Sequence, residues 1–351
     1  MSTSFISRTL QKRETISATK AKTLHVFNPE HDLALAVGCG PYTPPAEVLR
    51  LRKEKSLLPA LYAETGDFIL VRDDVTVEHL ASLPFYEEAS AKRLGIVFPH
   101  QLREAETEFE RILPWGWDHA LVRWLKDSGV SESLLPSVDR VEKIRMLSHR
   151  RNVMAFREEM AALMNGEVLL PPAELFTVEE AEEFLRKHPV AYFKAPWSSS
   201  GRGIVVSDHI TRKGLLEWCH GILRRQGSVM AEAAWNRVFD FATEWVIENG
   251  KPEFLGLSVF ETSSRGKYHG NIRAPQSELG EMIRRAAPDF NDEVIRMQKR
   301  VLDKLVAPFY EGYLGIDMLA DDKGRINPCV ELNVRLTMGH VGLLNARTQK
   351  Q

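Results

Sequence analysis

Two apolar stretches near the end of the 351-residue chain constrain its fold more than any other feature. They read "YLGIDMLA" and "RINPCVELN", and the turn-forming residues 322–324 separate them, which predicts a β-hairpin. Asp317 lies on the first strand and Glu331 on the second, so pairing can set the two carboxylates side by side. Two acids held together need a cation. Oxygen ligands from Asp317, Glu331 and Asn333 suit Mg²⁺, with Mn²⁺ as a second choice.

Side chains on an extended strand alternate between its two faces, so Glu331, Asn333 and Arg335 share one face. The alternative is an edge strand whose polar side chains are simply solvated. Apolar neighbours on both strands favour the packed hairpin over this alternative.

A second feature is the stretch "YFKAPWSSSGRGIVV", residues 192–206. Lys194 finishes an apolar strand, and the small residues after it allow backbone N–H groups to approach an anion such as phosphate. The stretch is not a Walker A motif, because the lysine precedes the glycines and no GK[ST] opens a helix. A mobile hairpin tip with a surface lysine is the alternative interpretation.

The order of these features resembles the ATP-grasp superfamily. Its pattern is a lysine-bearing strand before a glycine-containing loop, an acid-bearing hinge strand, a later aspartate and a closing E-x-N-x-R. Here these are Lys194 with "SSSGRG", "VMAEA" around Glu232, Asp317, and "ELNVR". The last stretch, "ELNVRLTMGHV", is similar to that of biotin carboxylase and related carboxylate-activating enzymes. The resemblance runs from about residue 139 to 347.

The resemblance implies roles for individual residues. Lys194 would contact the nucleotide phosphates, Glu232 would lie near the adenine amine, and Asp240 would bind the ribose, with Glu244 as a competing choice. Asp317, Glu331 and Asn333 would hold one or two Mg²⁺ ions, and Arg335 would face the transferring phosphoryl group. The lid over the phosphates would comprise Ser198, Ser199, Ser200, Gly201, Arg202 and Gly203.

The chain departs from the family pattern at the second phosphate-binding lysine, which usually opens the central domain. The stretch "LSHRRNV" offers Arg150 and Arg151 there, with Lys143 earlier in the chain. We assign Arg151 to the nucleotide, and an exposed helix residue is the alternative.

The implied activity is that of an ATP- and Mg²⁺-dependent ligase that forms ADP. It would activate a small-molecule carboxylate as an acyl phosphate and join it to an amine, chiefly by positioning and charge stabilisation. Two alternatives stay open: a small-molecule kinase on the same scaffold, and a nucleotide-binding module without turnover.

Two segments are candidates for the substrate. The basic stretch "SSRGKYHGNIRAP" supplies Arg265, His269 and Arg273 as a cradle for an anion, or else is a solvated loop. The stretch "NPEHDLALA" follows the first strand, where open α/β sheets commonly bind ligands, and Glu30 or Asp32 could receive a substrate ammonium group. A helix N-cap role for Asp32 is the alternative.

The expected fold class is α/β, an ATP-grasp fold preceded by a small parallel α/β domain. We expect a disordered leader over residues 1–22, with an organelle transit peptide as the alternative, and the N-terminal domain over 23–138. The ATP-grasp domain would span 139–351, with a lid subdomain over about 139–228 and a C-terminal subdomain over about 229–347. Helices are expected around 101–113 and 117–127 and as one helical stretch over 138–165.

Composition excludes some partners. The formal charge of −2 gives no preference for a polyanion, so we expect no nucleic acid. No apolar run reaches the roughly 18 residues that span a bilayer, and we expect no membrane partner and a cytoplasmic location. Cys39, Cys219 and Cys329 share no CxxC spacing and are interpreted as buried thiols in a reducing compartment.

Overall fold

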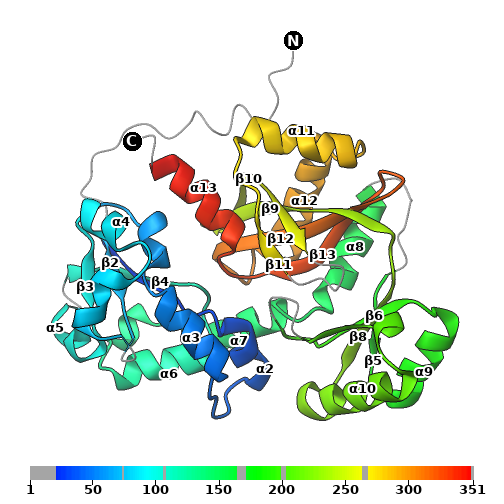
Figure 1. The fold of residues 1–351 in the computed structure, drawn as a ribbon, viewed down its shortest axis with the longest axis horizontal. Helices are drawn as coiled ribbons and strands as arrows, with labels where there is room; N and C mark the ends of the chain where they lie inside the picture. Colours follow the sequence, from blue (N-terminus) through cyan, green and yellow to red (C-terminus); the bar gives the residue numbers. More distant parts are fainter. Residues whose placement is uncertain are drawn as a thin grey trace. The chain divides into compact units, whose positions relative to one another are not determined.

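The structure is a computed structural model that describes residues 21–72, 75–105, 108–163, 171–198, 203–262 and 268–348. The described residues form two compact units, and Figure 1 labels their helices and strands. The central unit spans residues 146–334, and the other, here called the terminal unit, combines the chain up to Arg145 with the chain from Arg335 onward. Most of the predicted leader, residues 1–20, lies outside the described residues. The predicted domain limits stay predictions.

The terminal unit is built on a parallel sheet of four short strands in the order β3-β2-β1-β4. Strand β1 lies inside the sheet, where Leu24 pairs with Phe68 on one side and Ile112 on the other. All four β1 residues are buried, as expected for a parallel strand with both faces covered. The strands are β1 (Thr23–Val26), β2 (Phe68–Leu70), β3 (Gly95–Val97) and β4 (Arg111–Pro114).

The terminal unit also contains short helices, some of which connect these strands. They are α2 (His31–Val37), α3 (Ala46–Glu54), α4 (Tyr86–Ala91), α5 (Leu102–Ala105), α6 (His119–Asp127), α7 (Val138–Leu147), which runs into the central unit, and α13 (Met338–Thr348). The short 3-10 helices of this unit are η1 (Leu58–Leu61), η2 (Val77–Ser82), η3 (Pro99–Gln101) and η5 (Glu132–Leu134). The final helix α13 contacts η1, so the end of the described chain packs on the segment between α3 and β2.

The predicted helix over 101–113 is wrong in its second half. Helix α5 ends at Ala105, and residues 111–114 form β4, which pairs with β1. The apolar run at Ile112 is short, and a short run can fill either a buried strand or a helix turn. Its pairing with β1, which the local pattern does not show, decides the outcome.

The central unit contains two antiparallel sheets. The smaller has the order β5-β8-β6-β7, and the larger has the order β11-β10-β9-β12-β13. The smaller comprises β5 (Ala173–Leu175), β6 (Ala191–Lys194), β7 (Ile204–Val206) and β8 (Val229–Ala233), with helices α9 (Val178–Lys187) and α10 (Arg212–Gln226) and the turn η6 (Ser207–His209). The larger comprises β9 (Arg237–Glu248), β10 (Lys251–Thr262), β11 (Tyr268–Asn271), β12 (Gly312–Asp321) and β13 (Ile326–Asn333), with helices α8 (Asn152–Leu163), α11 (Gln276–Ala286) and α12 (Asp292–Leu305).

Polar turn and cap residues fix several of these elements. Thr177 caps α9 by accepting a hydrogen bond from the Glu180 backbone N–H at 3.1 Å, and the Glu180 carboxylate accepts one from the Phe176 N–H. Asn249 and Gly250 both have positive φ, which suits the tight turn that joins β9 to β10. None of the described helices combines the length and apolar character needed to cross a lipid bilayer.

The helical stretch predicted over 138–165 is interrupted. Helix α7 ends at Leu147 and α8 begins at Asn152, and residues 164–170 lie outside the described part of the chain. The Asn152 side chain donates to the carbonyls of Met146, Leu147 and His149 at 2.6 to 3.1 Å, which closes the first helix. The turn between the two helices carries Arg150.

Candidate active site

One face of the large sheet carries a concentration of acidic side chains. Asp317 of β12 pairs directly with Glu331 of β13, and Gly315 pairs with Asn333. Directly paired residues point to the same side of a sheet, with Cβ atoms roughly 5 Å apart, so the three predicted metal ligands share one face. The register between β12 and β9 adds Asp240 and Glu244 to this face, since they pair with Leu319 and Gly315.

Arg150 connects this acidic face to the segment that follows Lys194. Its guanidinium group donates to the Glu331 carboxylate at 2.7 Å, to the Ala195 carbonyl at 2.6 Å and to the Ser198 hydroxyl at 2.7 Å. The residue is buried, and its Nε has no hydrogen-bond partner among the described residues. A buried N–H without a partner is costly, so this donor fits an anionic ligand such as a phosphate.

Arg151, the residue assigned to the nucleotide from the sequence, contacts β5, and its role toward the nucleotide stays a prediction. Its side chain is 43% exposed and donates to Glu174 of β5 at 2.6 Å. Arg150 and not Arg151 lines the pocket beside Lys194. The two were not separable from the sequence, because the break in the helical stretch that turns Arg150 inward depends on Asn152 and its carbonyl contacts.

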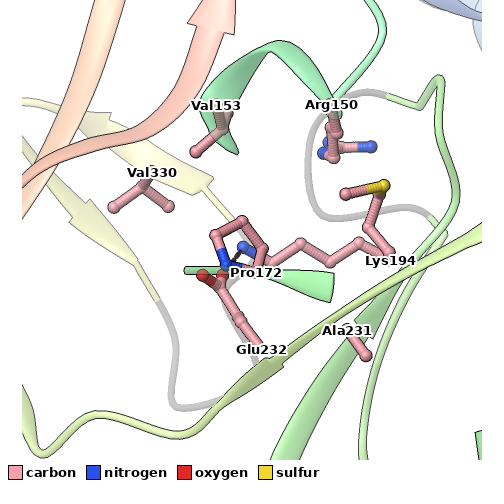
Figure 2. A pocket seen from close by; sticks show the side chains of 8 residues that line it. Arg150, Val153, Pro172, Lys194, Ala231, Glu232 and Val330 are labelled. Carbon is pink, nitrogen blue, oxygen red and sulfur yellow. Dashed lines mark hydrogen bonds and ion pairs between the residues drawn. The ribbon is translucent and has the colours of Figure 1, made fainter. Parts of the chain in front are cut away.

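Lys194 and Glu232 meet in a pocket between β6, β8 and α8 (Figure 2). The Lys194 ammonium group donates to one carboxylate oxygen of Glu232, and Arg157 of α8 donates to the other at 2.9 Å. Burial alone would raise the pKa of Glu232, but Lys194 and Arg157 outweigh it and hold the pKa at about 2. The pocket is further lined by Arg150, Val153, Pro172, Met230, Ala231 and Val330.

Arg157 is a residue that sequence reasoning missed. It is buried in α8 together with Val153, Phe156 and Met160. An arginine four residues after Val153 lies on the apolar face of the helix, and buried arginines are normally paired. That placement is the signal that could have identified it.

Asp240 and Glu244 differ in surroundings. Asp240 of β9 accepts a hydrogen bond from the Thr262 hydroxyl and lies 3.7 Å from Arg237. Burial raises its pKa, and these two contacts offset that effect only in part. Glu244 is almost fully buried and accepts from the Ser258 hydroxyl at 2.8 Å. The choice between them as the ribose-binding acid stays open.

The two ends of the predicted lid are described and its middle is not. Ser198 is buried and bound by Arg150, and Gly203 has a φ of +69°. A Cβ at Gly203 would lie 2.9 Å from the Ser198 Cβ, so glycine is required by both conformation and space. Ser199, Ser200, Gly201 and Arg202 lie outside the described residues.

Arg335 and Asp32, predicted for different roles, contact each other in the terminal unit. The Arg335 Nε and Nη2 both lie 2.9 Å from the Asp32 Oδ2. Asp32 lies in the first turn of α2, whose N-cap is Glu30, so the N-cap alternative for Asp32 is wrong. Glu30 is buried and accepts a hydrogen bond from Arg52 at 2.7 Å. The predicted roles of Arg335, Glu30 and Asp32 toward ligands stay predictions.

The predicted basic cradle is described only at its end. His269 lies on β11, the edge strand that pairs with β10, and Arg273 follows that strand. Both side chains are exposed. Arg265 lies outside the described residues, so the cradle stays a prediction.

Solved structures with a similar fold are known. The biotin carboxylase–β,γ-ATP complex from Campylobacter jejuni superposes with a TM-score of 0.54 at 15% identity, covering 92% of this chain and 67% of that one. The biotin carboxylase domain of Hydrogenobacter thermophilus 2-oxoglutarate carboxylase, solved with MgADP and bicarbonate, gives 0.50 at 14%, covering 95% and 71%. The chain has the ATP-grasp fold. This result confirms the predicted fold class, including the α/β domain before the ATP-grasp domain.

Sequence comparison adds one curated relative. The [butirosin acyl-carrier protein]–L-glutamate ligase of Niallia circulans is 27% identical over 147 residues, which are 41% of this chain. The match spans only 32% of the length of that relative. No protein-family model matches the chain.

Proposed function

We propose that the protein is an ATP-dependent ligase that activates a carboxylate as an acyl phosphate and joins it to an amine, with release of ADP. The observation that carries the proposal is the register that pairs Asp317 with Glu331, on the same face as Asn333. Biotin carboxylases with the same fold are solved with ATP or MgADP, and the curated relative is a ligase by name. These similarities support the proposal.

The phosphate end of the nucleotide would lie between Lys194 and Arg150. Lys194 has three N–H donors, and Glu232 is their one hydrogen-bond acceptor among the described residues, so two donors could serve phosphate oxygens. Arg150 contributes its Nε, which is buried and has no partner among the described residues. Arg157 neutralises part of the Glu232 charge, and this leaves a net positive cluster facing the ligand.

Asp317, Glu331 and Asn333 would hold Mg²⁺, or Mn²⁺, through hard oxygen ligands. When bound, the ion would neutralise charge on the phosphate oxygens. Two observations support a bound cation at these residues. The three side chains share one face of the sheet, and Arg150 supplies one positive charge beside the two carboxylates of Asp317 and Glu331.

The proposed reaction has two displacements. A carboxylate oxygen of the substrate attacks the γ-phosphorus of ATP, and the bond to the β,γ-bridging oxygen breaks as ADP leaves. An amine then attacks the acyl carbon, loses a proton, and displaces inorganic phosphate. Lys194 and Arg150 would hold the transferring group and stabilise its charge. No side chain has to act as a nucleophile.

The substrates of this chain are proposed only by class. The curated relative is named for joining L-glutamate to an acyl-carrier protein. An amino acid and a small or carrier-bound carboxylate are therefore the first substrates to assay.

The test is ADP release with MgATP across panels of carboxylates and amines, combined with hydroxylamine trapping of acyl phosphate as hydroxamate. We expect one carboxylate to stimulate ADP release and to yield hydroxamate. Asp317→Asn should abolish this signal, while Asp303→Asn, an exposed aspartate on α12, should retain it. A stable phosphorylated hydroxyl product would instead identify a kinase. Binding of MgATP without carboxylate-dependent turnover across the panels would also overturn the proposal.

A further inference from the structure

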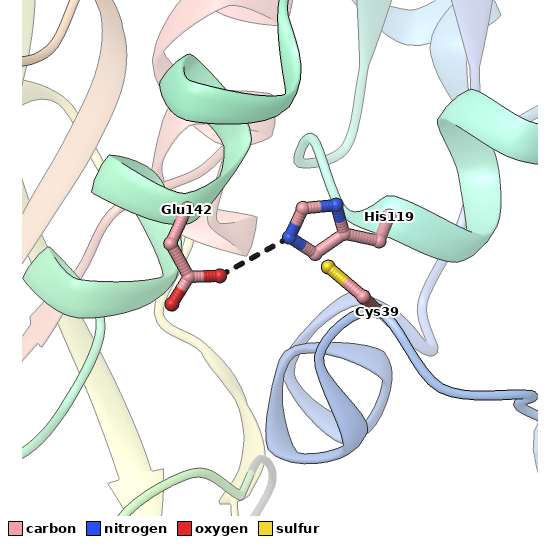
Figure 3. A group of neighbouring side chains, drawn as sticks. All are labelled: Cys39, His119 and Glu142. Atoms are coloured by element: carbon pink, nitrogen blue, oxygen red, sulfur yellow. Dashed lines mark hydrogen bonds and ion pairs between the residues drawn. The ribbon is translucent and has the colours of Figure 1, made fainter.

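Cys39, His119 and Glu142 of the terminal unit form a cluster that the proposed ligase reaction does not use (Figure 3). One ligand atom from each residue lies within 4.8 Å of the other two. The three residues come from three separate places in the chain: the loop after α2, the first turn of α6, and α7. Cys39 is exposed, which corrects the prediction that all three cysteines are buried.

We propose that these three side chains bind a zinc ion. A thiolate, an imidazole nitrogen and a carboxylate oxygen are the ligand types found in zinc sites, and three protein ligands leave a fourth position for water. The exposure of Cys39 gives that position an entry path from solvent. With a thiolate and a carboxylate, Zn²⁺ would form a centre with no net charge.

The observed geometry agrees with tetrahedral zinc. The His119 Nε2 and the Glu142 Oε2 lie 3.2 Å apart. Two ligands at about 2.1 Å from a tetrahedral ion are separated by roughly 3.4 Å, so these atoms are already near a coordinating distance. The Cys39 Sγ lies within 4.8 Å of both, and a change of its rotamer on the exposed side would complete the set.

Two arginines hold the ligands in place. The Arg145 Nη1 donates to the other carboxylate oxygen of Glu142 at 2.9 Å, and its Nε donates to the Leu35 carbonyl at 2.7 Å. Arg123 of α6 donates to the Cys39 carbonyl at 2.7 Å, which ties the loop to the helix that carries His119. Such outer contacts orient metal ligands. The two guanidinium groups oppose a cation electrostatically, and the two anionic ligands offset them.

The first experiment uses the full, untagged chain after dialysis against a chelator. When Zn²⁺ is added back and the excess is removed, the zinc content measured by plasma mass spectrometry should rise to one tightly bound ion per chain. Co²⁺ should produce the thiolate-to-metal charge-transfer band that sulfur ligation requires. Cys39→Ser should remove the band, and His119→Gln and Glu142→Gln should each weaken Zn²⁺ binding by at least the 10–100-fold typical of lost outer-shell contacts. His100→Gln, an exposed histidine of the same unit, is the matched control and should change neither.

The second experiment leaves the sequence unchanged, so a folding defect cannot mimic its result. Alkylation of each cysteine is followed by peptide mass spectrometry with and without Zn²⁺. Zinc should slow the alkylation of Cys39, and a chelator should restore its rate. Buried Cys219 and Cys329 should label slowly with and without zinc.

Three results would overturn the proposal: failure of the wild-type chain to retain zinc, retention of the cobalt band by Cys39→Ser, or alkylation of Cys39 that is insensitive to zinc. Asp317→Asn must leave the band intact, and this separates the zinc site from the proposed Mg²⁺ site. The zinc result is therefore independent of the ligase assay.

Discussion

The buried ion-pair cluster of Lys194, Glu232 and Arg157 supports a quantitative prediction. Glu232→Gln keeps the shape of the side chain but leaves two cations whose side chains are only 10% and 5% exposed. The pKa of Glu232 falls from 4.5 to about 2 on folding, and at about 1.36 kcal/mol per pKa unit this amounts to about 3 kcal/mol of stability. Breaking a buried pair by removing one partner typically costs about 3–5 kcal/mol, in agreement.

The sign of the pH dependence follows from the lowered pKa. The contribution is fully present above the unfolded-state value of 4.5 and is lost as pH falls toward the folded-state value of about 2. The difference in stability between wild type and Glu232→Gln should therefore shrink from about 3 kcal/mol at pH 7 to about 1 kcal/mol at pH 3.

The assay is urea unfolding at several pH values, followed by both tryptophan fluorescence and far-ultraviolet circular dichroism. Glu182→Gln is the matched control, because Glu182 pairs with Arg212 at the surface and should contribute less than about 1 kcal/mol. A loss below about 1 kcal/mol for Glu232→Gln at pH 7, or a loss that does not depend on pH, would refute the reasoning.

Three further outcomes are expected. Asp317→Asn should lower kcat/KM for MgATP by about 100-fold or more, with little change in the thermal unfolding midpoint, as measured by ADP release and calorimetry. Arg150→Lys keeps the charge but loses the planar fork that contacts Ala195 and Ser198, so affinity for a nonhydrolysable ATP analogue should fall by about tenfold in titration calorimetry, and unchanged affinity would contradict the proposed role. Gly203→Ala should cost more stability than Gly250→Ala in urea unfolding, because both glycines have positive φ but only at Gly203 would the added Cβ meet another atom, the Ser198 Cβ at 2.9 Å. Equal losses of roughly 1–2 kcal/mol would show backbone strain alone and contradict the steric argument.

The sequence predicted the parts of the site that depend on strand alternation and turn chemistry. The hairpin that pairs Asp317 with Glu331 follows from two apolar runs around a turn, and the structure shows that pairing. The position of Lys194 at the end of β6 follows from the apolar run before it. Both are local patterns, and local patterns survive folding when tertiary packing agrees with them.

Other features depend on contacts between distant segments and could not be predicted. Strand β4 exists because residues 111–114 pair with β1, nearly ninety residues earlier in the chain. Arg150 rather than Arg151 lies beside Lys194 because the Asn152 side chain contacts the last carbonyls of helix α7 and interrupts the helical stretch predicted over 138–165. The contact between Arg335 and Asp32 joins positions separated by 303 residues, and no pattern in either segment indicates it.

That last contact bears on how the chain is synthesised. Arg335 binds Asp32, and the Leu336 N–H donates to the Trp115 carbonyl at 2.9 Å. The terminal unit that contains the parallel sheet is therefore completed by residues beyond 334. A ribosome exposes β1 to β4 long before it exposes α13. The parallel sheet of the nascent chain therefore lacks these contacts while nearly two hundred intervening residues are translated. A stop codon shortly after residue 334 would leave the terminal unit without its C-terminal segment.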